Sequence, residues 1–331
     1  MFRILLIALA ALLVFRATAM AASLETYTDP AKTPPQFKLQ GEYEGELTRD
    51  GKTAHYGAQV IALSKQNMQL VLYHGGLPGD GWSRADKREK FDGKLVDNEV
   101  ASFSLKSSPP SILAHPGKLS FTGDNKGTLL QVTRKSPSIG AKPPPGAIVL
   151  FDGSGTDKFK GAQLTPERLF MPAAGRRGAV TKDAFGDVTL HVEFRTPLMP
   201  DARGQGRGNS GVYVQDRYEV QILDSFGLEG EDNECGGLYK IRQPKVNMCF
   251  PPLVWQTYDI DFTAARYKGG NKVQNARITV KHNGVVIQDN VELPAFTAGG
   301  EPEGSEAGPL HLQWHGDPVT FRNIWIVPKK S

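Results

Sequence analysis

The amino-acid sequence predicts an all-β protein in which a small β-rich domain precedes a larger two-sheet sandwich. Glycine and proline occur 36 and 23 times among 331 residues, which favours turns and short strands over long helices. Short segments in which apolar and polar residues alternate recur along the chain, and this period of two is typical of strands. In the second half of the chain, no segment has the pattern of a helix of three or more turns.

The first 21 residues have the pattern of a secretory signal peptide. Arg3 precedes an apolar run over residues 4–15, and small residues then offer cleavage sites that end near Ala21. Because the run is shorter than the roughly 20 residues that a membrane-spanning helix needs, cleavage is favoured over an anchor. We therefore expect an exported protein, periplasmic or extracellular, with no membrane span after cleavage. Residues 22–40 are polar and contain proline, and we expect a loose leader there.

The first domain is expected over residues 41–135. Alternating side chains predict strands over residues 56–62 and 68–73, and Asp92-Gly93 has the composition of a hairpin turn. Residues 136–147 follow, with three consecutive prolines between small residues. Such a segment sustains neither a strand ladder nor a helix, so we interpret it as a semi-rigid linker.

The second domain is expected over residues 148–328. Asn283-Gly284 between two apolar runs is the strongest hairpin signal in the chain. About eight strands at this spacing favour a sandwich or jelly roll, and a sandwich face that stays polar is a natural platform for a sugar. The expected strands cover residues 188–195, 212–214, 218–222, 255–262, 276–280, 285–287, 310–312 and 321–327.

The charge balance gives no support for a nucleic-acid partner. The formal net charge is +4, and it falls to +2 when a cleaved leader removes Arg3 and Arg16. The basic residues are also scattered among acidic ones rather than clustered.

In an exported protein, Cys235 and Cys249 are expected to form a disulfide worth about 3 kcal/mol, with two free buried thiols as the alternative.

The strand around Glu219 carries the strongest chemical signal. Glu219 and Gln221 are two residues apart, so they share one face of the strand. A carboxylate and an amide side by side are costly to bury without partners, which favours a functional role. Asp224 reaches the same side only if a bulge or the strand end redirects it. Its structural alternative is to cap the following turn.

Other polar candidates come from neighbouring segments. Glu193 and Arg195 share a face of an earlier strand, where a salt bridge on a wet surface is the alternative interpretation. Asn209 enters a strand from a glycine-rich loop. His315 follows a strand end, where loops often carry function, and a turn residue that bonds to the backbone is the alternative interpretation. Trp255 could stack on a sugar ring or belong to the core.

Four sequence blocks resemble the 3-keto-disaccharide hydrolase domain family. Residues 208–225 read GNSGVYVQDRYEVQILDS, residues 251–259 read PPLVWQTYD, and residues 282–285 read HNGV. Residues 312–325 read LQWHGDPVTFRNIW. The blocks occur in the order of the family and span about residues 148–328. The resemblance implies a concanavalin-like jelly roll and export to the periplasm or beyond.

The resemblance also implies a reaction. A ketone at C3 of a glycoside acidifies the hydrogen on C2, so a base can form an enolate that expels the aglycone from C1, and water then adds. Glu219 is the candidate base or acid, and His315 is the second candidate for proton transfer. The other candidate substrate-binding residues are Asn209, Gln221, Asp224, Arg195, Glu193 and Trp255.

Three alternatives compete with this interpretation. Ordinary double displacement needs two carboxyl groups about 5–5.5 Å apart, but on the strand of Glu219 the next residue on the same face is the amide Gln221. A non-catalytic, lectin-like sugar-binding module is the second alternative, since fold alone does not determine function. A structural or surface protein is the third.

The sequence requires no cofactor. Its glycine-rich loop leads into a strand rather than a helix and therefore lacks the dinucleotide-binding pattern. A divalent cation could bind through Asp224, Glu219 or Glu193, although no spacing of histidines and carboxylates demands one. The expected partner is a glycoside or oligosaccharide substrate.

Overall fold

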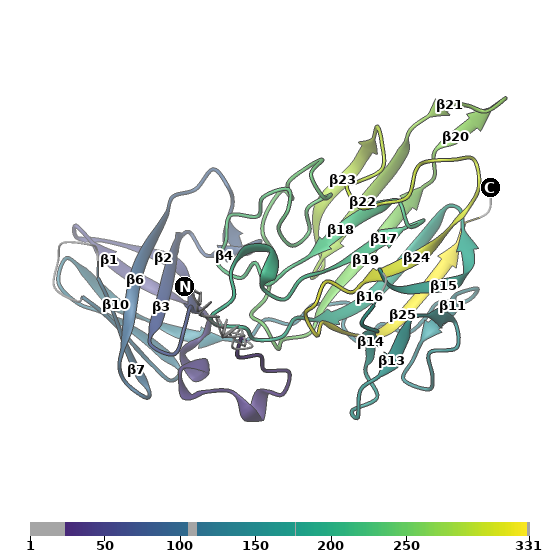
Figure 1. Ribbon diagram of the computed structural model, residues 1–331. Helices are drawn as coiled ribbons and strands as arrows, with labels where there is room; N and C mark the ends of the chain where they lie inside the picture. The colour runs from purple at the N-terminus through teal and green to yellow at the C-terminus, as the bar shows by residue number, and fades with distance from the viewer. Residues whose placement is uncertain (1–23, 105–110, 176, 330–331) are drawn as a thin grey trace, which may run out of the picture.

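The protein consists of a β-barrel beside a two-sheet β-sandwich (Figure 1). The structure, a computed structural model, describes residues 24–104, 111–175 and 177–329. Within these ranges the helical segments are three short 3₁₀ turns, so the predicted all-β class is confirmed. The predicted signal peptide lies outside the described residues. The 3₁₀ turns are η1 (Pro30–Lys32), η2 (Pro35–Leu39) and η3 (Gly204–Gly206).

The barrel is closed and its interior is filled by apolar side chains. Its strands pair in the order β1-β10-β9-β8-β7-β6-β3-β2, which leaves no free edge. Tyr43, Leu70 and Phe103 are among the buried side chains that fill it. The eight strands are β1 (Gly41–Arg49), β2 (Lys52–Ala62), β3 (Asn67–His74), β6 (Arg88–Asp97), β7 (Val100–Ser104), β8 (Ile112–His115), β9 (Lys118–Phe121) and β10 (Asn125–Val132). Along the chain, a short parallel pair separates β3 from β6, and it consists of β4 (Leu77–Pro78) and β5 (Gly81–Trp82).

Two expectations for this region are wrong. Asp92-Gly93 does not form a hairpin, because both residues lie inside β6. Gly93 pairs with Phe103, and a Cβ atom there would overlap the Phe103 ring, so this glycine serves close packing rather than a turn. The leader is ordered rather than loose over residues 24–40. Tyr27 exchanges two backbone hydrogen bonds of 2.9 Å with Leu198 of the sandwich.

The sandwich packs two antiparallel sheets around one core. The larger sheet has the order β13-β14-β25-β16-β19-β22-β23 with β11 paired to β25, and the smaller sheet has the order β12-β15-β24-β17-β18. Val192, Phe194, Val212, Val220 and Leu312 are among the buried residues of this core. The strands are β11 (Ile148–Phe151), β12 (Phe159–Lys160), β13 (Ala162–Leu164), β14 (Phe170–Pro172), β15 (Gly178–Phe185), β16 (Val188–Arg195), β17 (Ser210–Val214), β18 (Tyr218–Ile222), β19 (Gln256–Thr263), β22 (Ala276–His282), β23 (Val285–Leu293), β24 (Gly308–Gln313) and β25 (Thr320–Pro328).

Two hairpins show what turn chemistry reveals in advance. Asn283 and Gly284 join β22 to β23 with φ angles of 51° and 83°, as the sequence predicts. Gln215, Asp216 and Arg217 join β17 to β18, and the first two have φ angles of 56° and 55°. This second turn contains no glycine, and its sequence therefore gives little warning of it. A further hairpin, β20 (Arg266–Lys268) with β21 (Asn271–Gln274), projects from the sandwich on the side away from the barrel (Figure 1).

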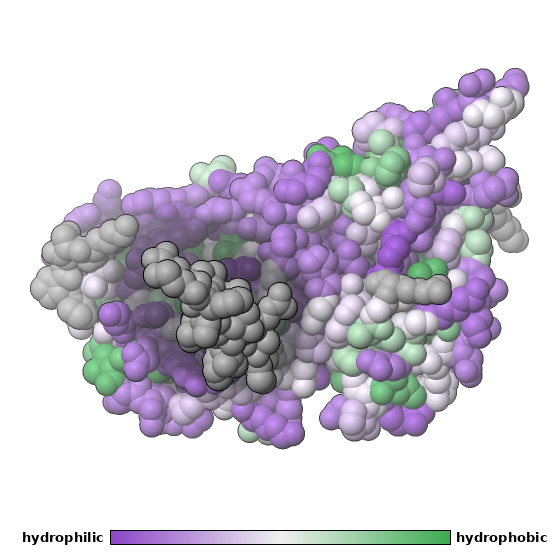
Figure 2. All heavy atoms as spheres, viewed as in Figure 1, coloured by the Kyte–Doolittle hydropathy of each residue, from purple (hydrophilic) through white to green (hydrophobic). Residues whose placement is uncertain are grey.

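The barrel packs against the sandwich through the outer face of β2 and β3. Ile61, Val71, Tyr73 and Trp82 are buried and continuous with the core of the sandwich. Figure 2 shows a mostly hydrophilic surface on the face in view, with apolar colour confined to small patches. Among the described residues, no helix has the length and apolar character needed to cross a membrane.

Candidate functional site

The outer face of the smaller sheet is lined by polar residues from three adjacent strands. Glu219 on β18 lies opposite Tyr213 on β17, which in turn lies opposite His311 on β24. Because side chains alternate along strands, Val212 and Leu312 point to the core while these polar residues point outward. We call the following six residues the polar face: Glu219, Gln221, Tyr213, Gly211, His311 and Gln313.

Glu219 is a buried carboxyl group with a single side-chain partner among the described residues. It is 2% exposed, and the Tyr213 hydroxyl donates to its Oε2 at 2.8 Å. Burial disfavours the charged form and outweighs the tyrosine hydrogen bond, which raises the pKa of Glu219 to about 8. A carboxyl group of this kind can exchange a proton near neutral pH.

Gly211 gives the Glu219 carboxyl group its place. A Cβ atom at Gly211 would overlap Glu219 Oε1, so any larger residue at position 211 would displace the carboxyl group. Gly211 pairs with Gln221 on β18. The acid therefore leans over the neighbouring strand toward the middle of the polar face.

Tyr213 is held by its neighbours on β24. Its ring stacks on His311 with centroids 4.9 Å apart, and Gln313 Nε2 donates to its hydroxyl at 3.2 Å. Both nitrogens of His311 are engaged, Nδ1 with Asp216 at 2.8 Å and Nε2 with Arg177 O at 2.8 Å. The pKa of Tyr213 is raised by burial and by Glu219, so its hydroxyl keeps its proton.

Sequence reasoning did not single out Tyr213 and His311. A signal was available, because each lies between apolar residues in an alternating strand: Tyr213 between Val212 and Val214, and His311 between Leu310 and Leu312. The alternation shows that both side chains leave the core, but only the strand order shows that they lie on the same face as Glu219. The pairing of β17 with β24 is a long-range contact that the sequence does not show.

An amide cluster borders the polar face. Gln221 Nε2 donates to Gln205 Oε1 at 3.0 Å, and Asn209 Nδ2 donates to Gln205 O at 2.7 Å. Asn209 is buried, and its Oδ1 has no hydrogen-bond partner in the part of the chain that the structure describes. A buried acceptor without a partner is available to a hydroxyl group of a ligand. No sequence signal pointed to Gln205, which lies between two glycines in the 3₁₀ turn η3.

His315 and Asp224 lie at the end of the polar face. His315 is exposed and lies two residues beyond the end of β24. Its role in proton transfer stays a prediction. Asp224 forms a buried ion pair with Arg207 at 2.7 Å and accepts a hydrogen bond from Phe226 N at 3.4 Å, which favours its structural alternative.

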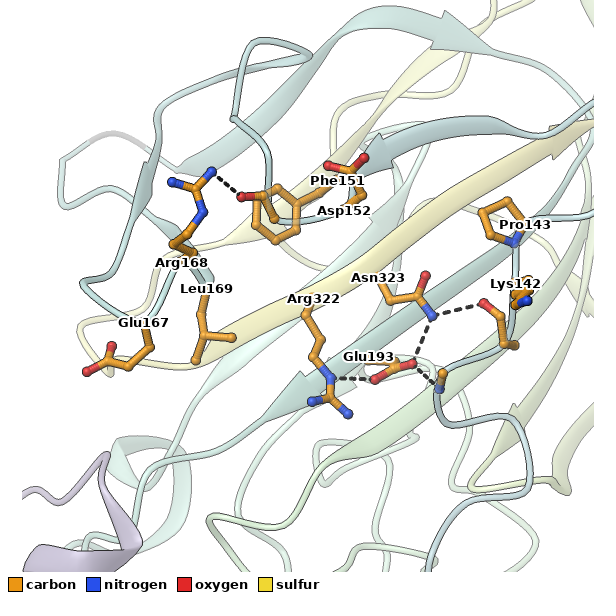
Figure 3. A pocket seen from close by; sticks show the side chains of 13 residues that line it. Lys142, Pro143, Phe151, Asp152, Glu167, Arg168, Leu169, Glu193, Arg322 and Asn323 are labelled. Atoms are coloured by element: carbon orange, nitrogen blue, oxygen red, sulfur yellow. Dashed lines mark hydrogen bonds and ion pairs between the residues drawn. The ribbon is translucent and has the colours of Figure 1, made fainter.

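The second polar face of the sandwich is the outer side of the larger sheet, where Glu193 lies (Figure 3). Glu193 is 1% exposed, and it accepts hydrogen bonds from Arg322 Nε at 2.6 Å, Asn323 Nδ2 at 2.9 Å and Gly140 N at 2.6 Å. Burial opposes its ionisation, but these donors together with His191 outweigh burial and lower the pKa of Glu193 to about 2. Glu193 therefore stays ionised.

The predicted linker lies along this second face. Ser138 Oγ donates to Asp259 at 2.6 Å, Ser136 Oγ is 2.6 Å from Thr257 Oγ1, and Ala141 O accepts from Asn323. One wall of a cavity of about 570 Å³ is formed by linker residues, and Glu193 is among the other residues that line it (Figure 3). The three hydrogen bonds that Glu193 accepts all come from protein groups, and the one from Gly140 N fastens the linker.

Arg195 and Trp255 belong to this same face. The guanidinium group of Arg195 lies 5.0 Å from the centre of the Trp255 ring, and that of Arg322 lies 4.1 Å from it. Arg195 also donates to Thr28 O at 3.2 Å. The sequence assigned Glu193, Arg195 and Trp255 to one substrate site with Glu219. The two sheets of the sandwich separate them, because packed sheets lie about 10 Å apart.

A protein-family model matches this chain over the sandwich and identifies the family to which the chain belongs. A family model described as a 3-keto-alpha-glucoside-1,2-lyase-like domain matches residues 146–327, which is more than half of the chain. The chain belongs to this family. The lyase-like domain thus contains both outer faces, while the barrel lies outside the match.

Solved structures resemble the chain over a similar share of its length. A protein of Parabacteroides distasonis provisionally assigned as a glycosyl hydrolase is 33% identical, with a TM-score of 0.52, over 56% of this chain and 85% of that chain. A second protein of that organism with the same provisional assignment is 20% identical, with a TM-score of 0.40, over 56% of this chain and 94% of that chain. No curated protein matches the chain.

The two cysteines of the lyase-like domain are free, buried thiols, so the disulfide expected from the sequence is not formed in this structure. Cys235 Sγ lies 3.1 Å from the Tyr258 hydroxyl, and Cys249 Sγ lies 3.4 Å from Phe250 O. Packing thus supplies polar partners for both groups. Burial raises the pKa of the Cys249 thiol well above its usual range.

The carboxylates considered for a cation are dispersed. Asp224 is paired with Arg207, Glu193 with Arg322, and Glu219 with Tyr213. Over residues 24–104, 111–175 and 177–329, no three histidine, cysteine, aspartate or glutamate side chains are grouped as a metal site. A divalent cation therefore has no ready-made set of protein ligands among these residues.

Proposed function

We propose that this protein cleaves 3-keto glycosides, with Glu219 as the base that removes the proton from C2. The observation that carries this proposal is the buried Glu219 carboxyl group, whose pKa is raised to about 8, beside the Tyr213 hydroxyl. The family description supports a substrate of the 3-keto-glucoside class. The assignment of the 33% identical relative supports action on a glycosidic bond.

The first step forms an enolate. Ionised Glu219 takes the proton from C2, and the electron pair of the C–H bond moves toward the C3 ketone oxygen. Once Glu219 carries the proton it can donate to the Tyr213 oxygen, which frees the Tyr213 hydroxyl to donate to the enolate oxygen. Tyr213 keeps its own proton because its pKa is raised, so it acts as a donor and not as a base.

The second step breaks the glycosidic bond. The enolate re-forms the ketone and a C1–C2 double bond, and the aglycone oxygen leaves with the electron pair of the C1–O bond. A proton neutralises the leaving oxygen, and His315 at the rim of the polar face is the proposed donor. Addition of water across the double bond, with hydroxyl to C1 and hydrogen to C2, completes hydrolysis. Release before that addition leaves the enone as a lyase product.

The composition of the polar face favours elimination over double displacement. Double displacement needs a second carboxyl group about 5–5.5 Å from the first. Glu219 is the single carboxylate among the six residues of the polar face, and its neighbours are amides, a tyrosine and a histidine. The amide cluster is suited to binding sugar hydroxyls, since Asn209 Oδ1 accepts no hydrogen bond from any described residue.

Product analysis in heavy water tests the proposal. The mature protein is mixed with a 3-keto disaccharide and, separately, with the unoxidised disaccharide, with and without a chelator. We expect release of the aglycone sugar from the keto substrate alone. The other product should be either the enone, which has no hydrogen at C2, or a 3-keto sugar that carries deuterium at C2. The Glu219→Gln variant is the control, because any deuterium it introduces reports spontaneous exchange.

Two other results would point elsewhere. Cleavage that gives a 3-keto sugar without deuterium at C2, and no enone, would indicate direct displacement at C1 and would overturn the elimination mechanism. Binding of keto or ordinary glycosides without any cleavage would instead support the lectin-like alternative. Loss of cleavage in the chelator would add a metal requirement to the mechanism.

We also propose that the protein acts outside the cytoplasm, as the signal-peptide pattern of residues 1–21 suggests. Expression of the full chain in a bacterial host, followed by fractionation and mass measurement, tests this. A periplasmic or secreted product shortened by about 21 residues is expected. A full-length product in the cytoplasm would refute it.

A further inference from the structure

The barrel contacts the sandwich at the two loops that border the polar face. Ala62 O, at the end of β2, accepts a hydrogen bond from Arg207 Nη2 at 3.3 Å, and the next carbonyl, Leu63 O, accepts one from Arg203. These arginines flank Gln205 in the loop that carries the amide cluster. The loop beside Gln221 is thereby fastened to the barrel.

The second loop, residues 223–245, is fastened by Arg84 in the turn between β5 and β6. Arg84 Nη2 donates to Gly230 O at 2.5 Å and to Pro244 O at 3.0 Å, and its Nε donates to Lys245 O at 3.1 Å. One barrel side chain therefore joins two points of the loop that are 14 residues apart in sequence. Arg84 thereby holds Gly230 and Pro244 close together and closes the segment between them.

Further contacts support the same loop from the barrel. Arg88 Nη1 donates to Leu228 O at 3.2 Å and forms an ion pair with Glu229. A Cβ atom at Gly227 would overlap Ile61 of β2, so the backbone of the loop lies directly on the barrel. Charge, hydrogen bonds and close packing thus act on one segment.

The inner part of this loop lies along β18 as an additional edge. Gly236 N donates to Gln221 O and Gln221 N donates to Gly237 O, both at 2.9 Å. Tyr239 N donates to Glu219 O at 3.2 Å. The backbone of both polar residues of β18 is therefore hydrogen-bonded to a loop that the barrel holds.

We propose that the barrel positions Glu219 for its reaction through the 223–245 loop, with Arg84 as the positioning residue that closes the loop. This inference rests on the proposed function of the polar face. Without Arg84, the loop can separate from β18, water can reach the carboxyl group, and the acid loses its defined orientation. A displacement of about 1 Å in a reacting group can lower a rate as much as 100-fold.

Hydrogen exchange tests the physical link without any substrate. In the full-length Arg84→Ala variant, we expect faster exchange at the amides of Gly236, Gln221 and Tyr239 than in the parent protein. Arg49→Ala is the matched control, because Arg49 bonds to Asn125 and Glu89 within the barrel and does not reach the loop. Unchanged exchange in Arg84→Ala would overturn the inference whatever the protein catalyses.

Kinetics test the positioning role. We expect kcat of Arg84→Ala to fall about 10-fold to 100-fold, with an apparent kinetic pKa shifted below that of the parent because Glu219 becomes hydrated. Arg84→Lys should recover part of the loss, and Arg49→Ala should match the parent. Loosened amides with an unchanged kcat and pH profile would overturn the inference. A parent protein that leaves 3-keto glycosides intact would refute the proposed function itself, before any variant is compared.

Discussion

Glu219 and Glu193 are both almost completely buried, on opposite outer faces of one sandwich, yet burial has opposite consequences for them. Glu219 has one neutral donor, Tyr213, and the pKa of Glu219 is raised to about 8. Glu193 has Arg322 and several other donors, and the pKa of Glu193 is lowered to about 2. Several donors, one of them a charged arginine, outweigh the effect of burial at Glu193, whereas the single tyrosine donor does not outweigh it at Glu219.

The difference separates chemistry from structural support. A fully partnered carboxylate such as Glu193 holds the linker and is not free to take a proton from a substrate. Glu219 keeps an incomplete set of partners, which costs stability and is typical of functional sites. The comparison can be tested by changing each acid in turn.

The largest expected effect is the loss of cleavage in Glu219→Gln. An amide of the same size cannot accept the C2 proton, so kcat should fall at least about 10³-fold. Glu193→Gln is the matched control, and its kcat should stay within a few-fold of the parent. Steady-state rates on a 3-keto glycoside give both values. Equal losses in the two variants would contradict the division of roles.

The pH dependence of the rate sharpens the same assignment. If Glu219 is the base, kcat/KM should rise with pH and level off above pH about 8, because the reactive form is the carboxylate. A rate that falls through this pH would show that Glu219 acts as the acid instead. The measurement is kcat/KM from pH 5 to pH 10, limited to the range in which the protein stays folded.

Stability should respond in opposite directions at the two acids. The folded state keeps the Glu219 proton up to pH about 8, whereas the unfolded state releases it near pH 4.5, so this acid lowers stability as pH rises between those values. Melting temperatures of Glu219→Gln and the parent should be similar at pH 4, with the variant higher at pH 9. A parallel decline of the two proteins would contradict the raised pKa.

At Glu193 the sign is reversed. The depressed pKa contributes stability that is present above pH 4.5 and is lost as pH falls toward 2. Glu193→Gln should therefore destabilise the protein at pH 7 by about 2 kcal/mol, because a charged acceptor of several hydrogen bonds is lost. Denaturant unfolding at pH 7 and at the lowest pH that keeps the parent folded measures the difference.

The smallest expected effect is at the linker. Ser138→Ala removes the hydrogen bond to Asp259 and should cost about 1 kcal/mol, with no change in kcat. Proteolysis within residues 136–147 should become faster in this variant. A large loss of activity would show that the linker face contributes to the reaction.

Local sequence patterns predicted the strands but not which of them meet. The alternation around Glu219 and Gln221, and the Asn283-Gly284 turn, depend on residues close in the chain. The assignment of Glu193 to the same site as Glu219 failed to anticipate that β16 and β18 belong to different sheets. Similar polar patterns on two strands carry no information about sheet membership.

The sequence by itself determined the all-β class and the order of strands along the chain. It also determined which side of each strand is polar and faces away from the core. These properties follow from local periodicity and turn chemistry. The tertiary structure alone decided that Tyr213 and His311 join Glu219, that Glu193 fastens the linker, and that the barrel holds the 223–245 loop. Each of these depends on pairing between distant segments, where packing and desolvation set the outcome.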